Sequence, residues 1–271
     1  MHKVMNINSV PIINFHKVDA NFEWGITRST PKQFEKLLQY LKSNNYETIS
    51  LSNLISGEDL PEKPIVITFD DSYESIFTRA FPIMQKYGYT GTVFVIAGYV
   101  GEWNTWDVNL GWLKFRHLSW LQIHELIQHG FEIGSHAVHH MDLTRMDTGI
   151  LRRELTESRL ILEQKTGQPV HFVSYPFGRY NDQVISISRN AGYKKACGCL
   201  SPAGFRKKEH EAFVLERKAC YLFDGIWNLK AKINKSPFTK LEHLKLRILN
   251  YCSYGTSLVK PSKFEYFASG N

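Results

Sequence analysis

The segment Ile65–Ser72, with the sequence IVITFDDS, constrains the fold of this chain more than any other stretch. Its first five residues are apolar or β-branched, a length that suits a buried strand and is too short for a helix. The run ends at two adjacent carboxylates, Asp70 and Asp71. In α/β proteins the carboxyl edge of a parallel sheet is where binding and catalytic groups gather. The alternative is that Asp70, Asp71 and Ser72 only cap the helix that follows.

Strand-like and helix-like segments alternate about seven times along the chain. Further strands are expected at Val10–Phe15, Gly91–Ala97, Phe131–Gly134, Val170–Tyr175, Lys194–Cys197 and Phe213–Cys220. This alternation is typical of a parallel α/β sheet. We expect a distorted barrel of seven or eight β/α units over residues 1–225, followed by a basic extension over residues 226–271.

Composition narrows the classes of protein that this chain could be. Hydrophobic residues make up 43% of the chain and aromatic residues 13%, which excludes a disordered chain. The net charge of +7 is concentrated late in the sequence, but no nucleic-acid-binding module accompanies it, so we expect no nucleic-acid partner. The basic tail from Lys230 could lie near anionic lipid, but it lacks a clean amphipathic stripe, and simple solvation is favoured.

The sequence also gives an expectation for localisation. Its first residues, MHKVMNINSVPIINF, lack a long apolar region and a small-residue cleavage site, and no stretch approaches the roughly 20 apolar residues of a membrane span. The four cysteines do not suggest a disulfide framework. These features predict a cytoplasmic protein or one peripheral at the membrane surface, unless an export signal lies outside this sequence.

A second group of candidate ligands lies in Ile133–Thr144, which reads IGSHAVHHMDLT. His136 and His140 are four residues apart, and on a helical turn two such imidazoles lie on one face and can reach a single ion. Like Asp71, they follow a predicted strand end, so the three side chains can meet at one edge of the sheet. Two histidines and one carboxylate with open positions are typical of a catalytic metal site. His139 is expected to be a bystander, although a shifted register could make it the ligand.

Several motifs resemble the polysaccharide deacetylase family of carbohydrate esterases, whose conserved unit is the NodB-homology domain. Thr68–Ser72 and Ser135–Thr144 resemble its first two motifs, and Ser174–Asn181 (SYPFGRYN) lies where the third is expected. Pro11–Val18 (PIINFHKV) looks like the amino-terminal region of the exopolysaccharide-deacetylase branch. The resemblance covers roughly residues 10–220 and implies a distorted β/α barrel of that family.

The resemblance implies a role for each matched residue. Asp71, His136 and His140 would hold a divalent metal, with Zn²⁺ favoured and Co²⁺ or Ni²⁺ as alternatives. Asp70 would be the general base that takes a proton from metal-bound water. The backbone N–H of Phe177 would stabilise the oxyanion that forms on the substrate.

The chain departs from the family pattern at two positions. Ser174 stands where the third motif usually begins with an arginine that steadies the base, so Arg179 or Arg217 would have to substitute, and Arg217 is favoured. The family's late histidine acid is not found on a late strand, since Leu241–His243 fits the letters but lies past the predicted barrel. The exopolysaccharide branch uses the histidine of its first strand, which is His16 here.

Three aromatic residues are candidates for substrate binding. Trp103 and Trp106 lie in a loop rich in Gly, Trp, Asn and Asp, where their rings could stack on a sugar or could simply pack over the barrel mouth. Tyr175 of the third motif is the third candidate. Asp142 is expected either to cap a helix or to orient a histidine.

We therefore expect a metal-dependent hydrolase that removes N-acetyl groups from an N-acetylated sugar polymer or glycan precursor. One alternative is an O-deacetylase or another amide hydrolase with the same site, because one barrel can host several hydrolyses. Another is a catalytically idle glycan-binding protein. The absence of both the motif arginine and the late histidine would fit this alternative. The sequence does not indicate an oligomeric state.

Overall fold

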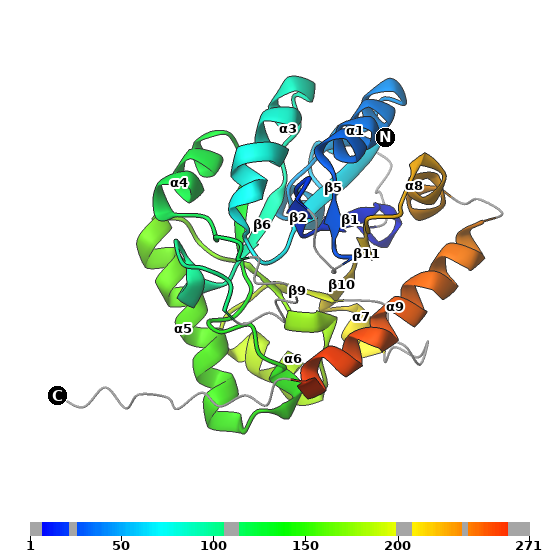
Figure 1. Cartoon of the computed structure of the whole chain (residues 1–271). Helices are drawn as coiled ribbons and strands as arrows, with labels where there is room; N and C mark the ends of the chain where they lie inside the picture. The colour runs from blue at the N-terminus through cyan, green and yellow to red at the C-terminus, as the bar shows by residue number, and fades with distance from the viewer. Residues whose placement is uncertain (1–6, 22–25, 106–113, 199–207, 235–237, 260–271) are drawn as a thin grey trace.

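The computed structural model describes residues 7–21, 26–105, 114–198, 208–234 and 238–259, without the side chains of 8, 208, 209 and 250–259 (Figure 1). Its centre is one parallel sheet with the strand order β10-β9-β8-β7-β6-β5-β1-β11. The strands are β1 (Ile12–Phe15), β5 (Pro64–Phe69), β6 (Thr92–Val95), β7 (Glu132–Ser135), β8 (Phe172–Ser174), β9 (Lys195–Gly198), β10 (Val214–Glu216) and β11 (Lys218–Ala219). β4 (Glu47–Thr48) pairs with β5, and β2 (Lys17–Val18) pairs with β3 (Arg28–Ser29) in a separate ladder.

One continuous segment forms both edges of this sheet. β10 pairs with β9, β11 pairs with β1, and Arg217 alone separates β10 from β11. The segment therefore brings the two edges together and nearly closes the sheet as a barrel. The sequence-based prediction of a distorted β/α barrel is confirmed.

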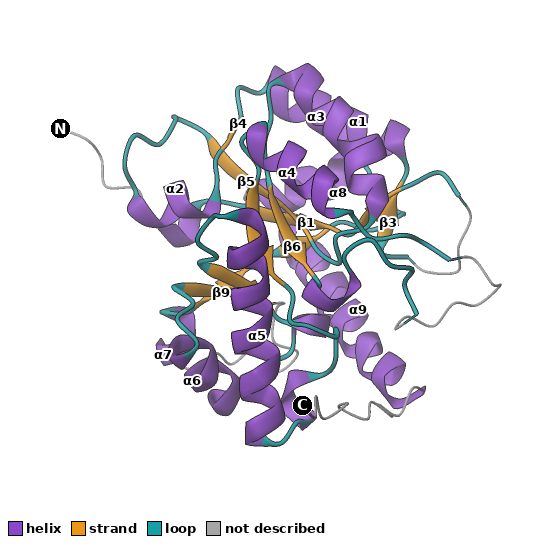
Figure 2. Ribbon diagram, turned by 90° about the vertical axis from the view of Figure 1, so that its left-hand side faces the viewer, coloured by secondary structure: helices purple, strands orange, loops and turns teal. Residues whose placement is uncertain are grey.

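Helices surround the sheet (Figures 1 and 2). They are α1 (Pro31–Ser43), α2 (Leu51–Ser56), α3 (Phe81–Tyr87), α4 (Trp120–Gln128), α5 (Thr148–Thr166), α6 (Asp182–Asn190), α7 (Lys208–Glu211), α8 (Ile226–Ile233) and α9 (Thr239–Val259). Thr30 and Gln33 form a capping box at the start of α1, as their spacing predicts. The sequence did not predict α2 or α8. None of the helices within the described residues is long and apolar enough to cross a bilayer.

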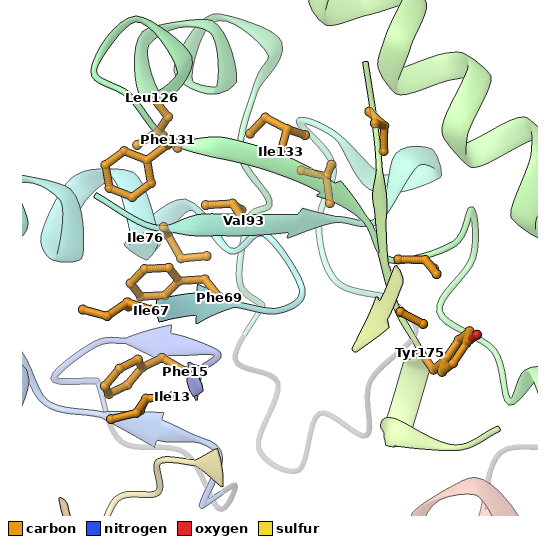
Figure 3. Packing of buried hydrophobic residues seen from close by; sticks show 14 of the residues in the cluster. Ile13, Phe15, Ile67, Phe69, Ile76, Val93, Leu126, Phe131, Ile133 and Tyr175 are labelled. Carbon is orange, nitrogen blue, oxygen red and sulfur yellow. The ribbon is translucent and has the colours of Figure 1, made fainter. Parts of the chain in front are cut away.

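Two apolar layers hold the barrel together, one on each side of the sheet. The outer layer packs alternate strand residues such as Ile13, Phe15, Ile67 and Phe69 against the surrounding helices (Figure 3). Residues two apart on a strand share a face, so the intervening positions point into the barrel. The inner layer contains Ile12, Val66, Phe94, Phe172, Cys197 and Leu215, with Leu51 and Leu54 of α2 packed against it.

The inner layer explains why a glycine occupies β7. A Cβ atom at Gly134 would lie 2.5 Å from two ring carbons of Phe94, so only glycine leaves room for that ring. The next inward positions along the strands, one step closer to the carboxyl edge, are polar and include Asn14, Thr68 and Ser174. The barrel interior therefore changes from apolar to polar toward the edge where the sequence places the candidate site.

Candidate metal and catalytic site

Arg217 and Asp70 form an ion pair in the barrel interior, between the inner apolar layer and the carboxyl edge of the strands. Arg217 Nη1 and Nη2 donate hydrogen bonds of 2.8 Å each to the two carboxylate oxygens of Asp70. Asn14 Nδ2 donates to Asp70 Oδ2 at 2.9 Å, and Arg217 Nη2 donates to Ser174 Oγ at 2.7 Å. The Thr68 hydroxyl donates to Asn14 Oδ1 at 2.8 Å. We call these five residues the barrel cluster, and all of them are buried.

Asp70 is held in its ionised form by this cluster. Burial is the largest influence and would raise its pKa, but the charge and hydrogen bonds of Arg217, together with the nearby histidines, outweigh it and lower the pKa of Asp70 to about 2. The two parallel hydrogen bonds from Arg217 also fix the orientation of the carboxylate. Asp70 is therefore an oriented anion at neutral pH.

Ser174 stands where the family pattern has an arginine, and in this structure an arginine reaches Asp70 from a different segment. Arg217 reaches Asp70 from the junction of β10 and β11, and the Ser174 hydroxyl accepts one of its hydrogen bonds. Arg179 is instead 2.6 Å from Asp142, with Nη1 donating to Oδ2. Of the two arginines that the sequence left open, the geometry brings Arg217 to Asp70.

Three side chains converge beside Asp70. Asp71 Oδ1 lies 3.3 Å from His136 Nε2 and 3.2 Å from His140 Nε2. The three candidate ligand atoms all lie within 4.8 Å of one another, and all three residues are buried. Within the described residues, this is the one group of three or more His, Cys, Asp or Glu side chains that could hold a metal ion.

The donor set fits a cation. His136 Nδ1 lies 2.7 Å from the Ser174 carbonyl oxygen, which can only accept, so Nδ1 carries a proton and Nε2 of the neutral ring is an acceptor. This Nε2 faces Asp71 Oδ1, a buried oxygen that makes no hydrogen bond within the described residues. Two acceptors at that distance require a proton or a cation between them. Burial lowers the pKa of His136, but the negative charge of Asp70 and the contact with Asp71 raise it overall, so the site favours positive charge.

Backbone strain is concentrated at this site. Seven non-glycine residues of the described chain have positive φ, and five of them lie in the three motifs: Asp71 (66°), Ser72 (50°), Ala137 (62°), His140 (52°) and Phe177 (57°). A left-handed backbone is unfavourable for such residues and persists only where the surroundings enforce it. The expected helical turn across His136–His140 is wrong, because Ala137 and His140 are left-handed and the segment is an irregular loop. The two imidazoles still meet at one point.

Glu154 of α5 holds this loop in place and was missed by the sequence analysis. Its Oε2 accepts hydrogen bonds from the backbone N–H groups of Val138 at 2.9 Å and His139 at 3.0 Å. Its Oε1 lies 2.6 Å from His139 Nδ1, so His139 points at Glu154 and is not one of the three converging ligands. A signal was present in the sequence, because Glu154 occupies a position on the buried face of α5 between Leu151 and Leu155.

A buried histidine fixes the backbone of Asp71. His117 Nδ1 donates to the Asp71 carbonyl oxygen at 2.7 Å, and its ring stacks on Tyr73 with centroids 5.1 Å apart. Burial lowers the pKa of His117 to about 4, so this ring is neutral. The sequence analysis did not single out His117, since nothing in its local pattern marks it.

The remaining predicted site residues fall into two groups. His16 follows β1 and is half-buried, it interacts electrostatically with both Asp70 and Asp71, and its buried Nδ1 has no hydrogen-bond partner within the described residues. The ring of Phe177 packs edge-on against His140 with centroids 4.8 Å apart. These two side chains therefore lie at the site.

The three predicted substrate contacts are placed differently. Trp103 is 45% exposed and lies against Arg116, and Trp106 lies outside the described residues. Tyr175 is fully buried, and its hydroxyl donates to Ser188 Oγ at 3.0 Å. A side chain in the core cannot contact a substrate, so the substrate-binding expectation for Tyr175 is corrected to a packing role. Asp142 caps the short turn at Leu143–Arg145 by accepting from Thr144 N–H, besides its ion pair with Arg179.

Comparisons with known proteins agree on one family. A family model for polysaccharide deacetylases matches residues 57–196. The poly-β-1,6-N-acetyl-D-glucosamine N-deacetylase of Staphylococcus aureus is 26% identical over 215 residues, which cover 69% of this chain and 71% of that protein. A polysaccharide deacetylase-like protein of Bacillus subtilis is 27% identical over 212 residues, covering 77% of this chain and 70% of that protein.

Solved structures share the fold. A Streptococcus pyogenes deacetylase in complex with acetate gives a TM-score of 0.70 at 24% identity, covering 83% of this chain and 98% of that one. A polysaccharide deacetylase from Bacillus cereus gives a TM-score of 0.69 at 25% identity, covering 83% of this chain and 69% of that one.

Proposed function

This chain belongs to the polysaccharide deacetylase family, and from this premise we propose that it is a metal-dependent hydrolase that removes N-acetyl groups from an N-acetylated glycan. One observation supports the proposal above the others. Asp71, His136 and His140 direct three ligand atoms at one buried point, and an oriented carboxylate, Asp70, lies beside it. Family membership alone would leave an idle site possible, and the combination of three candidate ligands with an adjacent oriented carboxylate supports hydrolysis over an idle site.

The proposed metal ligands are Asp71 Oδ1, His136 Nε2 and His140 Nε2. Two imidazoles and one carboxylate suit Zn²⁺, and Co²⁺ or Ni²⁺ can use the same donors. When bound, such an ion supplies Lewis acidity that acidifies water and polarises an acyl carbonyl, and a carboxylate as weakly basic as Asp70 depends on that acidity. Ser174 O and His117 contribute indirectly, by fixing the His136 ring and the Asp71 backbone.

Asp70 is the proposed general base. Its Oδ2 accepts hydrogen bonds from Arg217 and Asn14, whereas its Oδ1 accepts one from Arg217. Oδ1 therefore keeps more acceptor capacity and is the atom that we propose takes the proton of the attacking water. Arg217 is a positioning residue in this scheme, because it touches the base and orients it.

The proposed acid is His16, and the proposed oxyanion donor is the backbone N–H of Phe177. His16 is proposed to protonate the leaving amine because it follows β1 and interacts electrostatically with both aspartates. The left-handed backbone of Phe177 is a strained feature beside His140, where an oxyanion donor is needed.

We propose a polymer or precursor of N-acetylglucosamine as the substrate. Support comes from the Staphylococcus aureus relative, whose name gives poly-β-1,6-N-acetyl-D-glucosamine as its substrate. Trp103 and Trp106 remain the proposed sugar contacts, and residues 1–225 the proposed catalytic unit.

The test is acetate release from β-1,6-linked N-acetylglucosamine oligomers by zinc-reconstituted protein, measured beside Asp70→Asn. General base catalysis contributes about 10²- to 10⁴-fold, so the variant should lose at least about 100-fold in kcat. Asp182→Asn is the matched control, because Asp182 is an exposed aspartate that pairs with His210. Acetate release only from O-acetylated sugars would favour the O-deacetylase alternative, and sugar binding without any release would favour a glycan-binding protein.

A further inference from the structure

The positive charge of this protein is concentrated in its last segment. Residues 226–271 contain eight of the 33 Lys and Arg residues but two of the 26 Asp and Glu residues. They therefore account for +6 of the net charge of +7. Lys230, Lys232, Lys240, Lys245 and Arg247 lie within the described residues, and a basic surface attracts anions.

Two lysines of this segment are paired with buried acids, and two further basic residues are exposed. Lys232 of α8 is completely buried, with Nζ 2.5 Å from Asp224 Oδ2 and 2.5 Å from Glu242 Oε1. Lys245 Nζ lies 2.5 Å from Asp224 Oδ1 and 2.6 Å from Glu242 Oε1. Both acids are buried, so they offer no exposed negative charge in this region. Lys240 and Arg247 of α9 are exposed.

The outer side of α9 also carries an apolar stripe. Leu241, Leu244 and Ile248 are 66%, 54% and 55% exposed, and their spacing of three and four residues places them on one helical face. Leu246, on the opposite face, is buried against Ala219 and Tyr221. α9 therefore has one apolar face that packs on the barrel and a second that faces outward.

Most of the exposed large apolar side chains in the described residues lie in this region. The described residues contain nine exposed large apolar side chains, and six of them lie between residues 223 and 248. They are Phe223, Trp227, Phe238, Leu241, Leu244 and Ile248. α8 and α9 contact each other and lie on the outside of the barrel (Figure 1). Trp227 and Phe223 are 74% and 77% exposed, and exposed apolar side chains that gather in one region can mark an interaction surface.

We propose that this surface, which we call the α9 face (Phe238, Lys240, Leu241, Leu244, Arg247 and Ile248), docks on an anionic lipid bilayer. An interfacial helix places an apolar face in the headgroup region and basic residues beside it, and both features are present here. The sequence predicts no clean amphipathic stripe, because the buried and the outward apolar residues of α9 alternate along the chain. They lie on different faces only once the helix packs on the barrel.

A second copy of this chain fits the α9 face less well than a bilayer does. The α9 face contains two basic residues and no acid, so a symmetric dimer through it would gather like charges in one interface, which is destabilising. An anionic bilayer complements both the charge and the apolar stripe.

The docked orientation would place the candidate site near the bilayer. α9 contacts the short turn Pro176–Gly178, which contains Phe177. α9 thus passes close to the edge of the barrel where Asp71, His136 and His140 meet. Docking itself does not depend on the proposed hydrolysis, so the two can be tested separately.

The experiment is co-sedimentation of the full-length protein with vesicles of phosphatidylcholine containing 30% phosphatidylglycerol, beside vesicles of phosphatidylcholine alone. We expect binding to the anionic vesicles that weakens as salt rises, because screening reduces the attraction. Binding to neutral vesicles should be at least about fivefold weaker, since each basic residue near an anionic surface contributes a factor of about five.

Two variants with matched controls test whether the α9 face is the surface that binds the vesicles. Leu241→Ser/Leu244→Ser/Ile248→Ser should reduce vesicle binding at least about tenfold through the lost apolar area, whereas Leu121→Ser/Leu160→Ser, exposed leucines on α4 and α5, should leave it unchanged. Lys240→Glu/Arg247→Glu should reduce binding to a similar extent, and Lys165→Glu/Lys194→Glu should change it little. The charge variants alter only exposed side chains, so folding is preserved if the apolar variant proves unstable.

Three results would overturn the proposal. The first is the absence of binding to anionic vesicles at low salt. The second is binding that neither α9 variant reduces relative to its control. The third is a dimer in light scattering that dissociates in the apolar variant without vesicle binding by the wild type, since a second copy would then be the occupant.

Discussion

Two buried ionic clusters in this protein resemble each other in composition. They differ in whether a buried acceptor atom without a hydrogen bond lies beside them. The barrel cluster pairs Arg217 with Asp70 inside the barrel. A second cluster, which we call the helix cluster (Asp224, Lys232, Glu242 and Lys245), joins the end of the barrel to α8 and α9. Both contain carboxylates that are less than 10% exposed and are held by cations.

The helix cluster satisfies its own charges. Each of its carboxylates contacts two lysines, and Asn228 and the Tyr221 N–H supply further hydrogen bonds. The barrel cluster adjoins Asp71, whose buried Oδ1 makes no hydrogen bond in the described part of the chain and faces two imidazole nitrogens. A buried ion pair is therefore weak evidence of function by itself. An acceptor left without a donor beside strained backbone is the feature that distinguishes the candidate site.

The comparison predicts that breaking the helix cluster affects stability alone. Lys232→Met leaves Asp224 and Glu242 without their buried partner, which costs about 3–5 kcal/mol of unfolding free energy. Urea unfolding checks this, with Lys240→Met as the exposed control that changes the free energy by less than about 0.5 kcal/mol. The folded fraction should keep the wild-type kcat. A stable Lys232→Met protein with a lowered kcat would show that the two clusters are not separate in role.

Changing Arg217 should affect activity while the metal is retained. Lysine keeps the charge but cannot make two parallel hydrogen bonds to Asp70, so Arg217→Lys should lower kcat by about 10- to 100-fold with unchanged zinc content. Arg179→Lys is the control, because Arg179 pairs with Asp142. Wild-type kcat in Arg217→Lys together with a large loss in Arg179→Lys would assign the base-steadying role to the other arginine.

Glu154 should affect metal affinity through the loop that it holds. Glu154→Ala leaves the N–H groups of Val138 and His139 unpaired and frees the loop that contains His140. Loss of such an indirect partner typically costs 10- to 100-fold in affinity, so we expect the zinc dissociation constant to rise by about that factor. Competition with a chromophoric chelator measures it. Glu154→Gln should restore part of the affinity, and Glu157→Ala, exposed on the same helix, should have no effect.

The smallest expected effect is a change in how the free energy of unfolding falls at acid pH when Glu242 is replaced. Burial would raise the pKa of Glu242, but its hydrogen bonds from Lys232 and Lys245 lower it below the ordinary value of 4.5. A carboxylate with a lowered folded-state pKa stabilises the protein above pH 4.5 and loses that contribution as the pH falls further. Glu242→Gln should therefore flatten the decline in unfolding free energy below pH 4.5. An equally steep decline in the variant would show that Glu242 does not cause it.

Much of the fold could be predicted from the sequence because its signals are local. The apolar run Ile65–Phe69 and the capping residues Thr30 and Gln33 act over a few residues, and the structure has a strand and a helix start there. The barrel followed from the alternation of such segments. α2 was missed because its capping residues, Ser50 and Asn53, lie in a stretch that resembles a strand and a loop.

The site was less predictable, because its geometry depends on contacts between distant segments. The convergence of Asp71, His136 and His140 was expected, but the expected helical turn was not found, since positive φ at Ala137 is enforced by packing and not by local propensity. Glu154 and His117 act across 15 and 46 residues of sequence, respectively. The apolar-face position of Glu154 marks it as unusual, but no local pattern shows which segment either residue contacts. Tyr175 was misassigned because a motif position does not show whether its side chain points into the core.

The most direct test of the proposed metal site is zinc content and acetate release in Asp71→Ala, measured together and beside Asp182→Ala. Removing one of three ligands should leave well under one zinc per chain and reduce acetate release from N-acetylglucosamine oligomers by at least about 100-fold. The Asp182 variant should match the wild type in both measurements. Full zinc content with full activity in Asp71→Ala would contradict the assignment of Asp71, His136 and His140 as the metal site.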